Sequence, residues 1–357
     1  MKKNILVASI VGAFLATPAM ALEKGEHSFN AFGTLGVSSF GGEKDVKYGS
    51  EGQIQDKWRA DQHTKAAAQF SYGITDRLGL TAQTIIEAEK SSYKANVEKL
   101  YLSYKVQDDL NVRAGRLRTP FYMLSETKDE GHTYPWISLP DEVYAQAKLS
   151  NFEGVDLTHE IKLDSSTSLT LQGLYGQATN RDYYLYDELN DVDYKDIIGA
   201  NAQLNTLYGD FRLGYIQANM TFDDPMFRVK DDKAQFTSLG YKYDEGGLIN
   251  YTEFTRRVIS GDTNTVDSYY TTFGYHIDKF TPHVTYAKSS EKNSGSQISM
   301  TYGVSYDLNT NVKLKTEYKR VDTNNGYAGN FMEKGINIGL PNTYDGDIVS
   351  FAVDFKY

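Results

Sequence analysis

The sequence has no cysteine and only two tryptophans and seven prolines among its 357 residues. The absence of cysteine excludes a disulfide framework, so stability must come from a large core or from an uninterrupted hydrogen-bonded sheet. The net charge of −10 argues against the basic surface on which nucleic-acid affinity depends. After the first 21 residues, no apolar run reaches the roughly 20 residues that a membrane-spanning helix needs.

Patterns typical of enzymes and metal sites are also missing. The six histidines form no H-E-x-x-H motif and no clustered metal-ligand spacing. His159 and His276 fall on candidate strands, but neither has a nearby serine and carboxamide in an arrangement typical of nucleophilic catalysis. We therefore expect no enzyme activity, no catalytic residue, no metal and no cofactor.

The N-terminus has the composition of a secretory signal. Lys2 and Lys3 form a basic region, residues 5–16 form an apolar core, and residues 19–21 form an A-x-A cleavage site. We predict cleavage after Ala21, which defines a signal peptide at 1–21 and a single domain at 22–357. The alternative is a retained anchor, for which the apolar core is short.

The chain is rich in tyrosine, with 28 residues, although its mean hydropathy is −0.51. Many amphipathic rings in a polar chain are typical of proteins whose rings lie between hydrocarbon and water. Apolar and polar residues alternate with a period of two along most of the chain, and no segment shows a convincing helical period. The alternation predicts strands near 27–38, 66–74, 78–88, 100–106, 110–118, 155–163, 168–176, 196–204, 210–220, 234–243, 248–258, 269–277, 280–287, 298–306, 312–319 and 349–357.

Short and long connections alternate between these strands. The long ones are predicted at 39–64, 119–152, 177–195, 221–233 and 320–346. Short turns at one end and long loops at the other are typical of outer-membrane barrels. The polar faces carry too many Lys, Glu, Asp and Gln residues to fill a closed core, since unpaired burial costs several kcal/mol for each group. We therefore predict an all-β, antiparallel up-and-down barrel of about 16 strands, with apolar faces toward lipid and polar faces toward a water-filled lumen.

The chain resembles the Gram-negative outer-membrane general porins, which are trimeric barrels of 16 strands. The resemblance depends on the exported, cysteine-free, acidic chain of alternating strands, on the C-terminal strand DIVSFAVDFKY, and on AGRLRTPFYMLSE at 114–126. The last segment is similar to the end of the fifth strand and the start of the third loop in porins. The acidic-aromatic-glycine loop signature of enteric general porins is not found.

The resemblance implies a homotrimer in the bacterial outer membrane that passes small hydrophilic solutes and ions by passive diffusion. It also implies contacts with outer-membrane lipid and lipopolysaccharide, and recognition of the final strand, ending in Phe355 and Tyr357, by the barrel assembly machinery. The third loop of porins folds into the barrel and narrows it. Mapped onto this chain, acidic loop residues would face a basic wall across the pore. The predicted acidic residues are Glu126, Asp129, Glu130, Asp141 and Glu142, and the predicted basic residues are Arg113, Arg116, Arg118, Lys65 and Lys99.

Strict alternation from Leu110 directs Arg113 into the lumen but Arg116 and Arg118 toward lipid. Either a one-residue bulge at Gly115 shifts the alternation and places all three arginines in the lumen, or the strand already lies above the bilayer at Arg116. Lys105, Lys313, Lys315 and Lys319 are further lumen candidates, and the lysines either belong to the constriction or are simply solvated.

Two rival functions remain at this stage. A substrate-selective channel for phosphate, sugars or a small organic acid is the first alternative, and an adhesive or structural barrel is the second. The tyrosine-rich acidic segment 182–196 is either a solvated loop or a vestibule, a trimer latch or a calcium site. Ion preference, preferred solute and pore size are not encoded in any pattern that we recognise.

Overall fold

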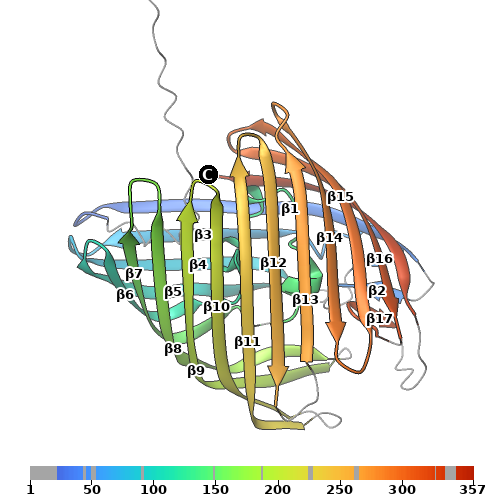
Figure 1. Ribbon diagram of the computed structural model, residues 1–357, viewed down its shortest axis with the longest axis horizontal. Helices are drawn as coiled ribbons and strands as arrows, with labels where there is room; N and C mark the ends of the chain where they lie inside the picture. The colour runs from blue at the N-terminus through green and yellow to red at the C-terminus, as the bar shows by residue number, and fades with distance from the viewer. Residues whose placement is uncertain are drawn as a thin grey trace, which may run out of the picture.

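The structure is a computed structural model that describes residues 22–42, 46–49, 54–89, 92–147, 149–185, 188–223, 228–260, 265–325, 327–333 and 343–357. Within this part of the chain, antiparallel strands close into one barrel (Figure 1). The first and last strands pair along eleven residues, from Phe32 opposite Lys356 to Gly42 opposite Gly346, and so complete the ring. The predicted signal peptide at 1–21 lies outside the described residues.

All sixteen predicted strand segments overlap a strand of the barrel. The barrel strands are β1 (His27–Gly42), β3 (Lys65–Gly73), β4 (Leu78–Glu89), β5 (Ser92–Gln107), β6 (Leu110–Arg118), β7 (Asn151–Lys162), β8 (Ser168–Leu185), β9 (Glu188–Thr206), β10 (Gly209–Asp223), β11 (Arg228–Glu245), β12 (Leu248–Ile259), β13 (Thr265–Tyr275), β14 (Phe280–Glu291), β15 (Ser296–Asn309), β16 (Val312–Asn324) and β18 (Asp345–Lys356).

The apolar rows face outward, as the alternation predicts. On β5, Leu102 and Tyr104 are 45% and 46% exposed, whereas Ser103 between them is buried. On β7, Val155 and Leu157 are exposed, and Asp156 between them is buried. The barrel therefore has the apolar-out, polar-in pattern of a membrane β-barrel.

Two long loops were predicted wrongly. Most of 177–195 belongs to β8 and β9, and most of 221–233 belongs to β10 and β11, so these pairs form tall hairpins. The apolar alternation fades in the upper parts of these hairpins, and for this reason the sequence pattern does not show the strands. The segment 182–196 is consequently mostly strand rather than loop.

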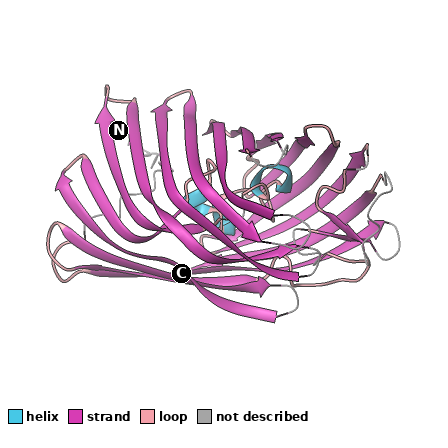
Figure 2. Cartoon of the chain, turned by 90° about the horizontal axis from the view of Figure 1, so that it is seen from below, coloured by secondary structure: helices cyan, strands magenta, loops and turns pink. Residues whose placement is uncertain are grey.

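The connection between β6 and β7 (residues 119–150, hereafter the third loop) folds into the barrel. It contains the short turns η1 (Ser125–Thr127), η2 (Gly131–Thr133) and α1 (Asp141–Tyr144), and Figure 2 shows the helical segments inside the ring of strands. Long loops were also expected at 39–64, 119–152 and 320–346, and the described residues of these segments lie mainly outside the barrel strands.

The first and last outer loops meet in a separate small sheet. In it, β2 (Val46–Tyr48) pairs with β17 (Phe331–Glu333). Phe40, Tyr48, Val321 and Phe331 belong to one buried apolar cluster at this place. No helix in the described residues is long and apolar enough to cross a membrane.

Candidate pore constriction

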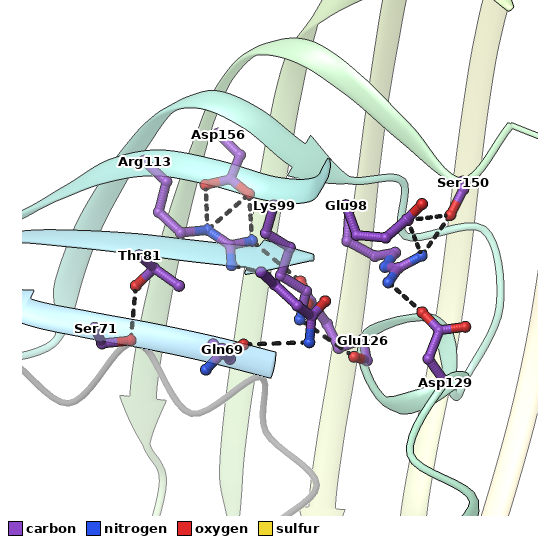
Figure 3. Close-up of polar contacts among 12 residues, drawn as sticks. Gln69, Ser71, Thr81, Glu98, Lys99, Arg113, Glu126, Asp129, Ser150 and Asp156 are labelled. Atoms are coloured by element: carbon purple, nitrogen blue, oxygen red, sulfur yellow. Dashed lines mark hydrogen bonds and ion pairs between the residues drawn. The ribbon is translucent and has the colours of Figure 1, made fainter. Parts of the chain in front are cut away.

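Arg113 lies at the centre of the predicted constriction, on the lumen face of β6. Its Nε atom donates to Asp156 Oδ1 and Oδ2 at 3.0 and 3.1 Å, and its terminal nitrogens approach Glu126 Oε1 at 3.4 Å (Figure 3). The guanidinium also lies 5.3 Å from the centre of the Tyr101 ring. A buried arginine between two carboxylates is held in one orientation, since both acids compensate its charge.

Glu126 of the third loop joins this arginine to β5. Lys99 Nζ lies 3.1 Å from Glu126 Oε2. Burial alone would raise the pKa of Glu126, but the nearby cations Lys99, Arg113 and Arg118 outweigh that effect and lower its pKa to about 2. Glu126 is therefore ionised at any physiological pH.

Arg118 forms the second contact between wall and loop. It bonds Glu98 Oε2 at 2.8 Å, and on its other side it reaches Asp129 Oδ2 at 2.5 Å. Burial opposes the ionised form of Asp129, but Lys128, Arg118 and Lys65 lower its pKa well below the usual range. Lys65 Nζ lies 3.9 Å from Asp129 Oδ1, at the edge of the same cluster.

Arg116 is not part of this cluster. It pairs with Glu153 at 2.7 Å, and Arg181 pairs with the same carboxylate at 2.8 Å. Arg116 lies opposite the exposed Leu100, and Glu153 lies two residues from the exposed Val155 and so shares its face, which places this triad on the outward side of the wall. Arg113, Arg118, Lys65 and Lys99 are brought together, and Arg116 is separated from them.

Of the two alternatives for Arg116 and Arg118, the one with a bulge at Gly115 is not found. Gly115 pairs in register with Tyr101 and Gly154, and its φ of 136° is the only irregularity there. The bulge lies in β5, where Gln83 faces Lys99 and Thr84 faces Val97, so that Glu98 is the extra residue. This bulge turns both Glu98 and Lys99 into the lumen, where both are buried.

The five predicted acids separate into two groups. Glu126, Asp129 and Glu130 approach the wall of β3–β6, whereas Asp141 and Glu142 face β16, where they lie 3.1 and 3.5 Å from Lys319 Nζ. Glu130 is only at the margin, with His132 Nε2 at 4.0 Å. Burial raises the pKa of Glu130, and the carboxylates Asp129 and Glu126 add to this against the opposing charge of Lys99.

The expected gap between loop acids and wall cations is absent for these pairs. Two rows of charge that face each other across water would be separated, whereas the charged atoms of the loop and the wall are in contact here. The three lysines of β16 also contact the loop: Lys313 reaches His132 O at 3.2 Å, and Lys315 reaches Gly131 O at 2.7 Å. The loop is therefore bonded to the wall on both sides.

The opposite side of the loop is apolar. Tyr122, Trp136 and Tyr144 of the loop and Tyr251 and Tyr270 of the wall form what we call the aromatic cluster. The Trp136 ring lies 5.1 Å from Tyr251 and 5.7 Å from Tyr270, and the Tyr122 ring lies 4.6 Å from Tyr144. Trp136 is 1% exposed, and its Nε1 donates to Thr285 Oγ1 at 2.8 Å. This packing fixes the loop against β12–β14.

Several buried anchors were not singled out from the sequence. Arg212 on β10 donates to Phe121 O at 3.4 Å, and the fully buried Glu253 on β12 accepts from Met123 N at 2.7 Å and from Tyr144 Oη at 2.9 Å. Asp354 on β18 pairs with Lys315 at 2.7 Å. The alternation of the strands predicts that these side chains face the lumen. It does not predict which loop atoms they contact, because those contacts form only in the folded barrel.

Comparison with known proteins supports the architecture. No family model and no curated protein match the sequence. Solved structures do: OmpT of Vibrio cholerae has 12% identity and a TM-score of 0.61, covering 94% of this chain and 98% of that one. The chain has the porin fold.

Two further neighbours have the same level of similarity. An anion-selective porin from Comamonas acidovorans has 12% identity and a TM-score of 0.60, covering 93% of this chain and 100% of its own. The outer membrane channel DcaP of Acinetobacter baumannii has 12% identity and a TM-score of 0.60, covering 94% of this chain and 98% of its own. The predicted all-β barrel of the porin type is thereby confirmed at the level of the fold, which is a fold of outer-membrane proteins.

Proposed function

We propose that the chain is an outer-membrane porin that passes small hydrophilic solutes and ions by passive diffusion, with the third loop as its constriction. The observation that carries this proposal is the inverted barrel, with apolar rows outside, paired charges inside and a loop folded into the lumen. A wall of this kind is stable only with lipid outside and water at the ends of the lumen.

The proposal includes the remaining sequence predictions. The chain 22–357 would be one exported domain that forms a homotrimer and is surrounded by lipid and lipopolysaccharide. The barrel assembly machinery would recognise its final strand, which ends in Phe355 and Tyr357. Arg113, Arg118, Lys99 and Lys65 would be the basic side of the constriction, with Glu126, Asp129 and Glu130 as the acidic side. Arg116, Asp141 and Glu142 would act outside this pairing.

A substrate-selective channel is the second candidate. It is favoured by the direct contact between loop acids and wall cations, because these ion pairs occupy the space between the loop and the wall of β5 and β6 and so narrow the route open to a solute. Such a channel would still be a passive one, and only the range of permeating solutes separates the two candidates.

We propose no enzymatic activity. His276 does lie between Asp244 Oδ1 and Thr281 Oγ1, at 3.0 and 2.9 Å, an arrangement similar in outline to a hydrolase triad. Thr281 is only 3% exposed, so a substrate does not reach its hydroxyl. Among the described residues, no group of three or more His, Asp or Glu side chains could hold a metal ion.

Planar-bilayer recording of the detergent-purified protein tests the proposal. Stepwise conductance, together with liposome swelling that falls with solute size, is the expected result, and the mass in detergent should be that of three chains. Absence of both conductance and liposome swelling would contradict the proposed channel function. A sharp preference for one solute class in the swelling assay would instead favour the selective channel.

A further inference from the structure

Arg113 is held more closely by the barrel wall than by the third loop. Its Nε donates to both oxygens of Asp156, and its Nη2 donates to Asp156 Oδ2 at 2.5 Å. The two contacts with Glu126 of the loop are each 3.4 Å long, which exceeds the usual length of an N–H···O bond (Figure 3). Asp156 lies directly opposite Arg113 in the β6–β7 pair, and its side chain is 1% exposed. The direction of the guanidinium therefore depends on what holds Asp156.

Asp156 is held in turn by amide side chains on the next two strands. Gln172 on β8 donates from Nε2 to Asp156 Oδ2 at 2.7 Å, and Asn201 on β9 donates from Nδ2 to Gln172 Oε1 at 2.7 Å. Gln172 follows the outward-facing Leu171 and is paired directly with Asn201, so both amides face the lumen. We call Gln172 and Asn201 the amide row. It joins the carboxylate of β7 to β9.

The bond directions in the amide row follow from the charge of Arg113. An arginine stays protonated in proteins, and an ionised carboxylate paired with it can only accept hydrogen bonds. Gln172 must therefore turn its NH2 group toward Asp156, which leaves its carbonyl oxygen facing Asn201, and Asn201 must donate to that oxygen. Both amides thus donate in the direction of Asp156. Hydrogen bonds aligned in this way polarise one another, so the row restrains the carboxylate more than Gln172 alone would.

We propose that Gln172 and Asn201 are positioning residues for Arg113, and that they contribute to the ion selectivity of the channel although they are uncharged and act through Asp156. The inference rests on the proposed channel function and adds two selectivity residues to it. Ion selectivity depends on the charged groups that line a pore. Because Arg113 and Asp156 carry opposite charges, a change in their separation changes the field that a passing ion meets. The amide row fixes that separation from the side of the carboxylate.

Gln172→Leu tests this role, because it removes the amide without changing any charge. Asp156 is then no longer held from both sides and can turn away from Arg113, whose remaining contacts with Glu126 are long. The guanidinium is less neutralised, so the reversal potential in a salt gradient across a planar bilayer should shift toward anion selectivity. Asn201→Leu, one bond further from Asp156, should give a smaller shift in the same direction.

Gln203→Leu is the matched control for these variants. Gln203 lies on the same face of β9 as Asn201, but it donates to Asn205 and not to the amide row. Its removal should leave the reversal potential unchanged. Gln172→Asn is a second test variant that keeps the lumen wall polar and withdraws the amide from Asp156 by one methylene group. It should resemble Gln172→Leu.

A double-mutant cycle separates positioning of Arg113 from a direct effect of Gln172 on passing ions. In the Arg113→Ala background, Gln172→Leu should cause no shift toward anions, because no guanidinium is left to position. If Gln172 only compensates the charge of Asp156, its removal would shift selectivity toward cations equally in both backgrounds, and this result would overturn the inference.

A role in stability alone is also distinguishable. It would lower the free energy of unfolding of Gln172→Leu and Gln172→Asn without moving the reversal potential of either, and that outcome would overturn the positioning role while the channel function stands. A shift in Gln203→Leu as large as that in Gln172→Leu would overturn it as well. A wild-type protein without conductance would overturn the proposed function itself, and this inference with it.

Discussion

Arg113 and Arg116 are three residues apart on one strand and have opposite surroundings. Arg113 is 5% exposed between Asp156 and Glu126 in the lumen, whereas Arg116 shares Glu153 with Arg181 on the outward side. Side-chain direction on a strand alternates, so two residues of the same type can have unrelated roles.

The first prediction concerns ion selectivity. Arg113→Ala removes a cation from the lumen and leaves Asp156 and Glu126 without it, so the channel should shift toward cations, and Arg118→Ala should do the same. The measurement is the reversal potential in a salt gradient across a planar bilayer. Arg116→Ala should not change it, because that guanidinium faces outward. A shift in Arg116→Ala as large as in Arg113→Ala would contradict the assigned faces.

The second prediction concerns pH. The pKa of Glu126 is lowered to about 2 in the folded protein, against about 4.3 for an unperturbed glutamate. Its ion pairs with Lys99 and Arg113 therefore stabilise the contact between loop and wall fully above about pH 4.3 and are lost as the pH falls through about 2. Titration of Glu126 should therefore leave conductance the same at about pH 5 and about pH 8, and should change it only in strong acid.

Glu126→Gln is the comparison for the pH experiment, because it lacks the titrating group. Its acid-induced change should be smaller than that of the wild-type protein. A transition in the conductance of the wild-type channel between about pH 5 and pH 7, where Glu126 stays ionised, would show that another group controls the loop.

At the scale of single elements, the strands were predictable and the third loop was only partly so. The alternation located every barrel strand, since one face meets hydrocarbon and the other water along the membrane-spanning part. It failed for the upper ends of β8–β11, where charged and polar residues interrupt the apolar rows. In the loop, the sequence suggested Glu126 and Asp129 as acids facing a basic wall across the pore, whereas in the structure they contact Arg113 and Arg118 directly.

The reason for these limits is physical. Which face a residue occupies depends on its immediate neighbours in sequence, whereas its partner depends on how far the loop extends across the lumen. The contact between Met123 and Glu253 and the pair of Lys315 with Asp354 join positions far apart in the chain. The bulge at Glu98 was likewise hidden, because no glycine or proline marks it.

The two tryptophans provide the prediction for the loop. Trp136→Ala should destabilise the protein by about 3–5 kcal/mol, because it removes a large buried side chain and leaves a cavity. Trp58 is 56% exposed, so Trp58→Ala should have a much smaller effect. The comparison is made by denaturant unfolding in lipid vesicles, with proteolysis of the loop as a local readout. Similar costs for the two variants would contradict the packing described for the aromatic cluster.

At the scale of the whole molecule, the barrel is an inverted protein whose outer surface is apolar. Leu157 is 46% exposed on the outward side of β7, and Gln172 on β8 faces the lumen, where it donates to Asp156 at 2.7 Å. An arginine introduced at Leu157 and, separately, at Gln172 therefore compares the cost of a charge on the outer and inner sides of the same wall.

Leu157→Arg should lower the unfolding free energy in vesicles, by up to about 2–4 kcal/mol for a position at the bilayer midplane. Gln172→Arg adds the same charge in the lumen beside Asp156 and should cost much less. Unfolding titrations of both variants in the same lipid give the comparison. A larger loss for Gln172→Arg would mean that the lumen, and not the outer wall, is the dry side.

The pairing of β1 with β18 has a consequence for biogenesis. The ring stays open until the C-terminal strand meets the N-terminal one, so a nascent chain that lacks residues 345–356 has two unprotected sheet edges and no sealed interior. The pairing of β2 with β17 joins the segment after β1 to the segment before β18, and so adds a second contact between the two ends of the chain. Opening of the folded barrel therefore requires that the β1–β18 and β2–β17 pairings break together, which favours slow unfolding once the barrel is inserted.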